Sequence, residues 1–128
     1  MSYYLDRLLP VAFDKVVIRT VEALKKEGFG ILTDIDVQET LNKKIGVDFP
    51  SYRILGACNP ALAYEALKLE NKVGTMLPCN VVIRDAGNGQ TEVAAIDPVA
   101  SMQAIDNPAL KRAAEQVRAK LARVVAEL

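Results

Sequence analysis

The sequence predicts an α+β fold, with a mainly antiparallel or mixed sheet of about five strands and long helices on one face. Strand-like and helical segments alternate along the chain. Two β-rich runs, Cys79–Arg84 and Thr91–Ile96, flank the loop Asp85–Gly89, whose Asn-Gly pair is typical of a hairpin. The last segment carries an apolar stripe at helical spacing, which needs a sheet or a partner to cover it.

The length of 128 residues predicts one domain, residues 1–128. Hydrophobic residues make up 51% and charged residues 25%, which are ordinary values for a globular protein. The 16 basic residues balance 16 acidic ones, so no overall field attracts nucleic acid or an anionic membrane. We therefore expect neither as a partner.

The N-terminal segment and the two cysteines favour a cytoplasmic protein. Asp6 and Arg7 interrupt the apolar run that a secretory signal would need. No window approaches the roughly 18 consecutive apolar residues of a membrane span. Cys58 and Cys79 form no CxxC pair and are too few for a disulfide scaffold, so we expect both thiols to be reduced.

The first part of the chain predicts a strand, a helix and a second strand. Ser2–Leu9 reads as a strand that ends at Pro10. Apolar residues then recur at helical spacing, which predicts a helix at about 13–27 with Gly28 as its stop. Phe29–Ile35 follows as the second strand.

The next elements are a short helix and a third strand. Asp36 and Glu39 have the spacing of a capping box, so a helix is predicted at about 37–45, ending at Gly46. Tyr52–Ala57 is the third strand.

The same tetrapeptide begins two further helices. Asn59–Leu62 and Asn107–Leu110 both read Asn-Pro-Ala-Leu, in which the amide caps and proline suits the first helical position. Helices are predicted at about 60–70 and 108–127. The residues around the two copies do not match, so the repeat is a good helix start and not a duplicated unit.

The chain contains no histidine, which limits its chemistry. Ser-His-Asp and Cys-His nucleophile pairs and histidine-containing metal sites are excluded. We recognise no catalytic constellation, so whether the protein is an enzyme stays open, and we expect no resident metal or cofactor. Asp34, Asp36 and Asp97 would suit magnesium, although capping and solvated loops explain them better.

Cys58 lies in the segment Gly56–Pro60, immediately before a predicted helix cap. Its sulfur would be close to the positive end of a helix dipole, which lowers a thiol pKa and favours anions. Gly56 would allow a ligand or another backbone to approach closely.

Cys79 lies in the segment Leu77–Val81. On a strand it shares a face with Val81 and Ile83, and a small buried hydrophobic residue is the commonest fate of a free cysteine.

We therefore predict a small-molecule site bordered by the two cysteine segments and Asp97, with a polar group captured at the helix start after Cys58. The candidate residues are Gly56, Cys58, Asn59, Pro60, Pro78, Cys79, Asn80 and Asp97. One alternative is thiol redox chemistry or two-coordinate Cu(I) at Cys58 and Cys79. A second is an interaction protein whose cysteines only fill the core.

Several segments together resemble the family known as domain of unknown function 302. They are Phe29–Leu32 leading into Asp34–Val37, then Gly56–Pro60, Leu77–Val81 and Asp97-Pro98. The resemblance implies a single α+β domain of the TATA-binding-protein-like group, often seen as a homodimer, and implies no settled activity. The DNA-binding role of that architecture is not carried over, because fold does not fix function. Our hypothesis is a cytoplasmic homodimer that binds a small molecule.

Overall fold

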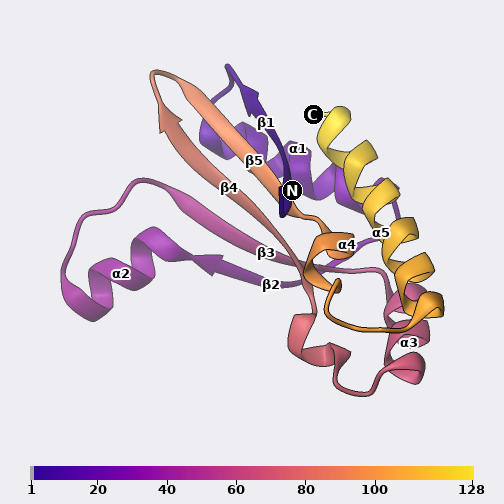
Figure 1. The fold of residues 1–128 in the computed structure, drawn as a ribbon. Coiled ribbons are helices and arrows are strands. Elements are labelled where there is room, and N and C mark those ends of the chain that lie inside the picture. The colour runs from indigo at the N-terminus through magenta and orange to yellow at the C-terminus, as the bar shows by residue number, and fades with distance from the viewer. Residues whose placement is uncertain (1) are drawn as a thin grey trace.

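The protein contains one five-stranded antiparallel sheet, in the order β1-β5-β4-β3-β2 (Figure 1). The structure, a computed structural model, describes residues 2–128. The strands are β1 (Tyr4–Leu9), β2 (Gly30–Asp36), β3 (Tyr52–Cys58), β4 (Cys79–Gly87) and β5 (Gln90–Ile96). The first strand of the chain pairs with the last one, with Tyr4 opposite Ile96. The predicted α+β class and its five strands are confirmed.

The predicted helices are present, with small differences at their ends. They are α1 (Phe13–Lys26), α2 (Val37–Ile45), α3 (Pro60–Leu69) and α5 (Pro108–Ala126). The sequence did not predict two short elements, the 3₁₀ helix η1 (Val73–Met76) and the helix α4 (Pro98–Ser101). Each spans only four residues, too few to show a helical period.

Side-chain caps start α3 and α5 where the sequence predicts. The Asn59 carboxamide accepts the N–H of Leu62, and the Asn107 carboxamide accepts those of Ala109 and Leu110. Both copies of Asn-Pro-Ala-Leu are therefore helix starts, as predicted. Such caps stabilise a helix by about 1 kcal/mol each.

The hairpin between β4 and β5 is tighter than the predicted loop. Asn88 and Gly89 have φ angles of 57° and 74°, as a two-residue type I′ turn requires. Pairing continues to Gly87 opposite Gln90, with a register shift between Asp85 and Gly87. Because of this irregularity, β4 continues to Gly87 and includes the first residues of the predicted loop.

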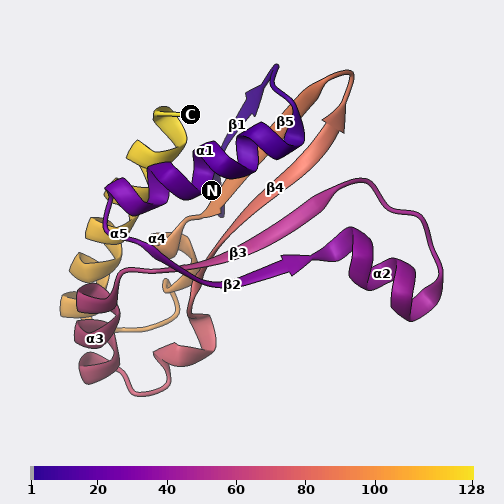
Figure 2. The ribbon, with the colours of Figure 1, turned by 180° about the vertical axis from the view of Figure 1, so that it is seen from behind.

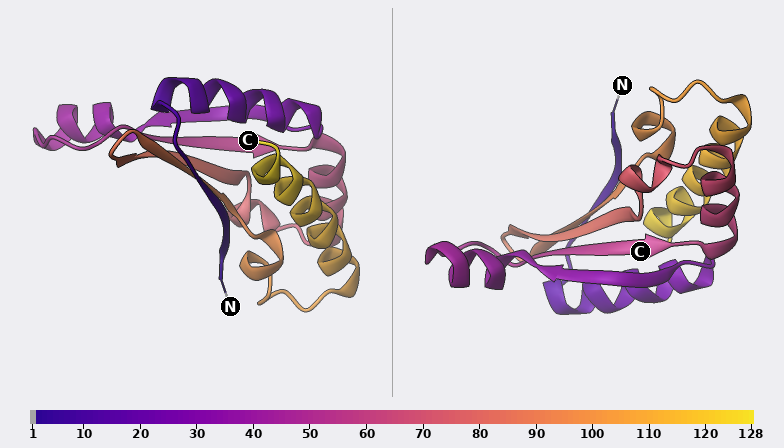
Figure 3. Two further views of the ribbon diagram at one scale, coloured as in Figure 1. Left: turned by 90° about the horizontal axis from the view of Figure 1, so that it is seen from above. Right: turned by 90° about the horizontal axis from the view of Figure 1, so that it is seen from below.

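The long helices α1 and α5 pack on the same face of the sheet (Figure 2 and Figure 3). The strands contribute the fully buried residues Leu55, Val81, Ile83, Val93 and Ala95. The helices contribute Val16, Ala23, Leu24, Leu121, Val124 and Val125. A second buried cluster joins α3, η1 and the start of α5, and comprises Ala66, Val73, Met102, Leu110 and Ala114.

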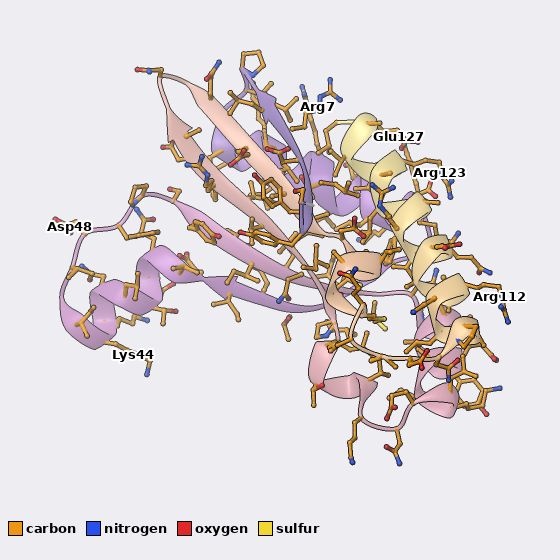
Figure 4. The ribbon with its side chains drawn as sticks, in the orientation of Figure 1. Arg7, Lys44, Asp48, Arg112, Arg123 and Glu127 are labelled. Carbon is orange, nitrogen blue, oxygen red and sulfur yellow. The ribbon has the colours of Figure 1, made fainter. Side chains whose placement is uncertain are left out.

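The two ends of the described chain are also connected. In Figure 4, Arg7 on β1 lies beside the C-terminal end of α5. Its Nη1 donates a hydrogen bond to the backbone oxygen of Ala126 at 2.8 Å. The side chain therefore joins the edge strand β1 to the last helical turn, where carbonyls lack helical partners.

α2 and the loop after it, residues 37–51, extend from the end of the sheet that is far from α3 and α5 (Figure 1). We call this segment the α2 arm. No residue of α2 is buried, and Lys44 and Asp48 point outward from the arm (Figure 4). The loop exposes Val47 and Phe49 as well.

Within residues 2–128, no helix combines the length and the apolar character needed to cross a bilayer.

Candidate functional site: a thiol-lined cavity

The two cysteine segments, 21 positions apart in the chain, meet at the end of the sheet. Strands β3 and β4 are antiparallel neighbours, and Ala57 lies directly opposite Cys79. Cys58 is the next residue along β3, so strand alternation directs its side chain to the face opposite that of Cys79. Both carry free thiols.

Both cysteines line a single cavity of about 40 Å³, together with Asn59 and Pro78. The other walls come mainly from α3 and α5, through Leu62, Ala63, Ala66, Leu110, Ala113, Ala114 and Val117. Phe29 and Met102 also contribute, one from each buried cluster, so the cavity lies where the two clusters meet.

The volume of the cavity limits what it can hold. A single water molecule needs roughly 10–15 Å³, whereas metabolite sites usually span roughly 300–1,000 Å³. A cavity of about 40 Å³ therefore accepts one ion, or the end of a molecule a few atoms in size.

The thiols differ in environment. Burial, and to a smaller extent the neighbouring Cys58, raises the pKa of Cys79 to about 11. Cys79 is therefore protonated at neutral pH, because an apolar wall disfavours a free thiolate. Cys58 is half-buried and is separated from α3 by the cap residue Asn59.

Gly56 lies away from the cavity lining, beneath a side chain of the neighbouring strand. A Cβ at this position would lie 2.1 Å from Oγ1 of Thr33 and 2.8 Å from Cγ of Pro78. The close approach predicted at this glycine therefore comes from two of the protein's own side chains.

Pro60, Asn80 and Asp97 also lie outside the cavity lining. Pro60 is the first residue of α3. Asn80 is exposed on β4, where alternation turns it to the face opposite Cys79. The buried carboxylate of Asp97 accepts the N–H groups of Val99 and Ala100 at the start of α4 and pairs with Arg118, whose Nε lies 2.9 Å away. The structure thus brings Cys58, Asn59, Pro78 and Cys79 together and leaves four candidates elsewhere.

The residues that sequence reasoning missed are the small ones on the helices. Ala63 and Ala66 on α3, and Ala113 and Ala114 on α5, leave the space that forms the cavity. Part of this set belongs to the predicted apolar stripe of the last helix. A stripe indicates burial, but it does not show where two packed surfaces fail to fill the space between them.

The aspartates weighed for magnesium have other partners. Asp34 forms a two-pronged ion pair with Arg53, in which Nε lies 2.7 Å from Oδ1, and this pair lowers the pKa of Asp34. Asp36 caps α2 by accepting the N–H of Glu39. Within residues 2–128, no three side chains of the His, Cys, Asp and Glu types are grouped so as to hold a metal.

The fold and the cavity define a small α+β protein with an apolar hollow that is lined by two cysteines among other residues. A family model described as "Domain of unknown function DUF302" matches residues 6–128, and the chain belongs to this family. The fold is similar to the crystal structure of an uncharacterized conserved DUF302 protein from Bacillus stearothermophilus. The two chains are 31% identical with a TM-score of 0.90, and the match covers 98% of each. No curated protein matches the sequence.

Proposed function

We propose that this protein binds a small ligand in the thiol-lined cavity. The observation that supports the proposal is the meeting of Cys58 and Cys79 at one hollow with apolar walls from two helices. A cavity that packing leaves open costs stability, so a ligand that fills it is bound favourably.

The ligand, or the part of it that enters, is apolar or soft and only a few atoms in size. The Asn59 carboxamide already accepts the N–H of Leu62, and Pro60 has no N–H. The first turn of α3 therefore has few donors left for a polar group. Recognition accordingly depends on the apolar walls and the sulfur atoms.

A redox or nucleophilic function is less well supported. Attack by a thiol requires the thiolate, and the pKa of Cys79 is raised to about 11. The chain has no histidine to act as a base.

Xenon is a suitable probe, because it enters dry apolar cavities. We expect xenon to raise Tm by roughly 1–2 °C at a concentration equal to its Kd, and to give a bound ¹²⁹Xe resonance. Ala113→Leu should fill the cavity and abolish both effects. Ala109→Leu is the matched control, because Ala109 is also half-buried on α5 but does not line the cavity. Absence of xenon binding to the unmodified protein would contradict the proposal.

We also propose that the protein is a homodimer in which the α2 arm contacts the second copy. A nine-residue helix is marginal in water by itself, and α2 has no buried residue. Val37, Leu41 and Ile45 are spaced four apart and form an apolar stripe on it. Val37 and Leu41 are half-buried and Ile45 is exposed by 67%, and with the exposed Val47 and Phe49 of the loop they form an apolar surface of the kind that marks interaction sites.

Sedimentation velocity tests the dimer. Ile45→Lys should shift the protein toward monomer, because it places a charge in the proposed contact. Ile18→Lys on α1 is the control, since Ile18 and Ile45 have similar exposed fractions of 60% and 67%. Equal behaviour of the two variants, or a monomeric unmodified protein, would refute the assignment.

A further inference from the structure

We propose that the face of the sheet opposite α1 and α5, the open face, carries a second binding site. Its ligand is an uncharged planar heterocycle with neighbouring N–H and C=O groups, such as the base of a purine nucleoside. The site is a hollow of about 360 Å³ on β1, β5, β4 and β3. It shares no lining residue with the thiol-lined cavity, so this inference does not rest on the function proposed there.

The hollow uses a surface that the protein core leaves free. In Figure 1, α1 lies behind β4 and β5, so the open face is turned toward the viewer. Val82 and Ala94 line the hollow and are half-buried. Ile83 and Val93, their neighbours in the chain, are fully buried on the other face, as strand alternation requires.

The register of the strands gives the hollow a low floor between two rows of longer side chains. Ala94 lies directly opposite Val82, and these short side chains form the floor. One row comprises Tyr4, Ile96 and Asn80, and the other comprises Glu92, Arg84 and Tyr52. A flat ring can lie on such a floor between the rows. The volume of about 360 Å³ also falls within the roughly 300–1,000 Å³ of small-molecule sites.

The polar side chains of the hollow determine the class of ligand. Nε of Arg84 donates to Oε1 of Glu92 at 2.7 Å, so the two charges balance and the site favours a neutral ligand. This bond leaves further donors on Arg84 and the second oxygen of Glu92, and the exposed Asn80 carboxamide adds two donors and an acceptor. Hypoxanthine and guanine carry an N–H donor beside a C=O acceptor on one ring edge, so they match this arrangement.

Tyrosine rings supply the aromatic contacts. Tyr3, Tyr4 and Tyr52 line the hollow, so three of the four tyrosines in the chain are gathered there. The rings of Tyr3 and Tyr4 are in edge-to-face contact, with centroids 4.9 Å apart. Because aromatic side chains bind planar bases through their π-faces and edges, this gathering favours a heterocycle over a sugar or a lipid chain.

Calorimetric titration of the whole protein with inosine tests the proposal, and we expect one inosine bound per chain. Purine riboside has the same rings and sugar but lacks the N–H and C=O edge. It should bind roughly tenfold more weakly, because polar groups in the hollow would lose their partners. Equal affinities for the two nucleosides, or no binding of inosine, would overturn the proposal.

Two variants test the residues of the hollow. Tyr3→Ala should weaken inosine binding about tenfold, because it removes an aromatic contact. Tyr64→Ala on α3 is the matched control, since Tyr3 and Tyr64 are exposed by 67% and 63% and only Tyr3 lines the hollow. Glu92→Gln should weaken inosine binding more than purine riboside binding, because it removes a charged acceptor for the N–H group. Thermal melting of each variant shows that it is folded. Equal inosine affinity in Tyr3→Ala and Tyr64→Ala, or an unchanged nucleoside preference in Glu92→Gln, would contradict the site.

Sedimentation velocity of Tyr3→Ala detects the other use of an open sheet face, which is contact with a second copy of the chain. We expect this variant to sediment like the unmodified protein. If Tyr3→Ala instead converts a dimer to monomer and inosine does not bind, a second copy covers the hollow and the proposal is wrong.

Discussion

At the scale of single residues, Gly56 occupies a position where neighbouring atoms leave no room for a side chain. The oxygen of Thr33 and the ring of Pro78 occupy the space where a Cβ would lie. Glycine at this position therefore allows β2 and the Pro78 segment to approach β3 closely.

Gly56→Ala should lower the free energy of unfolding by about 1–3 kcal/mol, because the new methyl group overpacks a filled space. Urea denaturation measures the change. Gly30→Ala on the adjacent strand is the control, since its nearest neighbour to a Cβ would be a carbonyl oxygen at 3.9 Å. Thr33→Ala should restore part of the loss, and its failure to do so would show that Pro78 carries the conflict.

The Cys79 thiol should react slowly with iodoacetamide. Its pKa of about 11 leaves only about one molecule in a thousand as thiolate near pH 8. The rate should increase about tenfold per pH unit up to pH 11, measured by mass spectrometry of peptides containing Cys79. Cys58→Ala removes the competing signal. Rapid labelling at neutral pH would contradict the buried, protonated state.

At the scale of elements, the Asp34–Arg53 pair joins β2 to β3. The Arg53 guanidinium lowers the pKa of Asp34, so the ionised carboxylate is favoured in the folded state. Its stabilisation is present above the ordinary aspartate pKa of 3.8 and is lost as pH falls through the lower folded value.

Asp34→Asn should therefore lower stability by up to about 1 kcal/mol near neutral pH, because the pair is partly exposed. The difference from the unmodified protein should shrink as pH falls below 3.8. Denaturant titrations across that range would show it. A difference that stays constant with pH would mean that the pair contributes no titratable stability.

Signals within a few residues were sufficient to predict most helices and strands from the sequence. The carboxamides of Asn59 and Asn107 fix two helix starts, and Asn88-Gly89 fixes the hairpin. These signals act within a few residues, so they can be read from the chain. α4 also begins with a local cap, from Asp97, but its four residues are too few to show a helical period in the sequence. The ion pair of Asp97 with Arg118 on α5 joins residues 21 positions apart, so no local pattern shows it.

The candidate site was predicted in part, for the same reason. The cysteine segments were expected to border one pocket, and both line the cavity. The opposite orientation of Asn80 follows from strand alternation and could have been predicted from its place after Cys79. The size of the hollow depends on how Ala66 and Ala114 face each other across two helices, which no local pattern encodes.

At the scale of the whole molecule, α5 belongs to both buried clusters. Leu110 lies in the cluster with α3, and Leu121 lies in the main core. Because one continuous helix connects them, we expect the clusters to unfold together.

Leu110→Ala and Leu121→Ala should each lower the global free energy of unfolding by about 2–5 kcal/mol. Circular dichroism and tyrosine fluorescence should report one shared transition for each variant. Leu67→Ala, at a residue exposed by 43%, should have a much smaller effect. Two separate transitions in Leu110→Ala would show that the α3 cluster is an independent unit.

The pairing of β1 with β5 governs how the chain can be made. Tyr4 on β1 pairs with Ile96 on β5. During synthesis, β1 therefore leaves the ribosome long before β5, its hydrogen-bonding partner, has been made. Contacts between such distant positions slow folding, because a long loop must close before they form. A nascent chain that stops before β5 leaves its opening strand unpaired and available to chaperones, or to the same strand of another nascent chain.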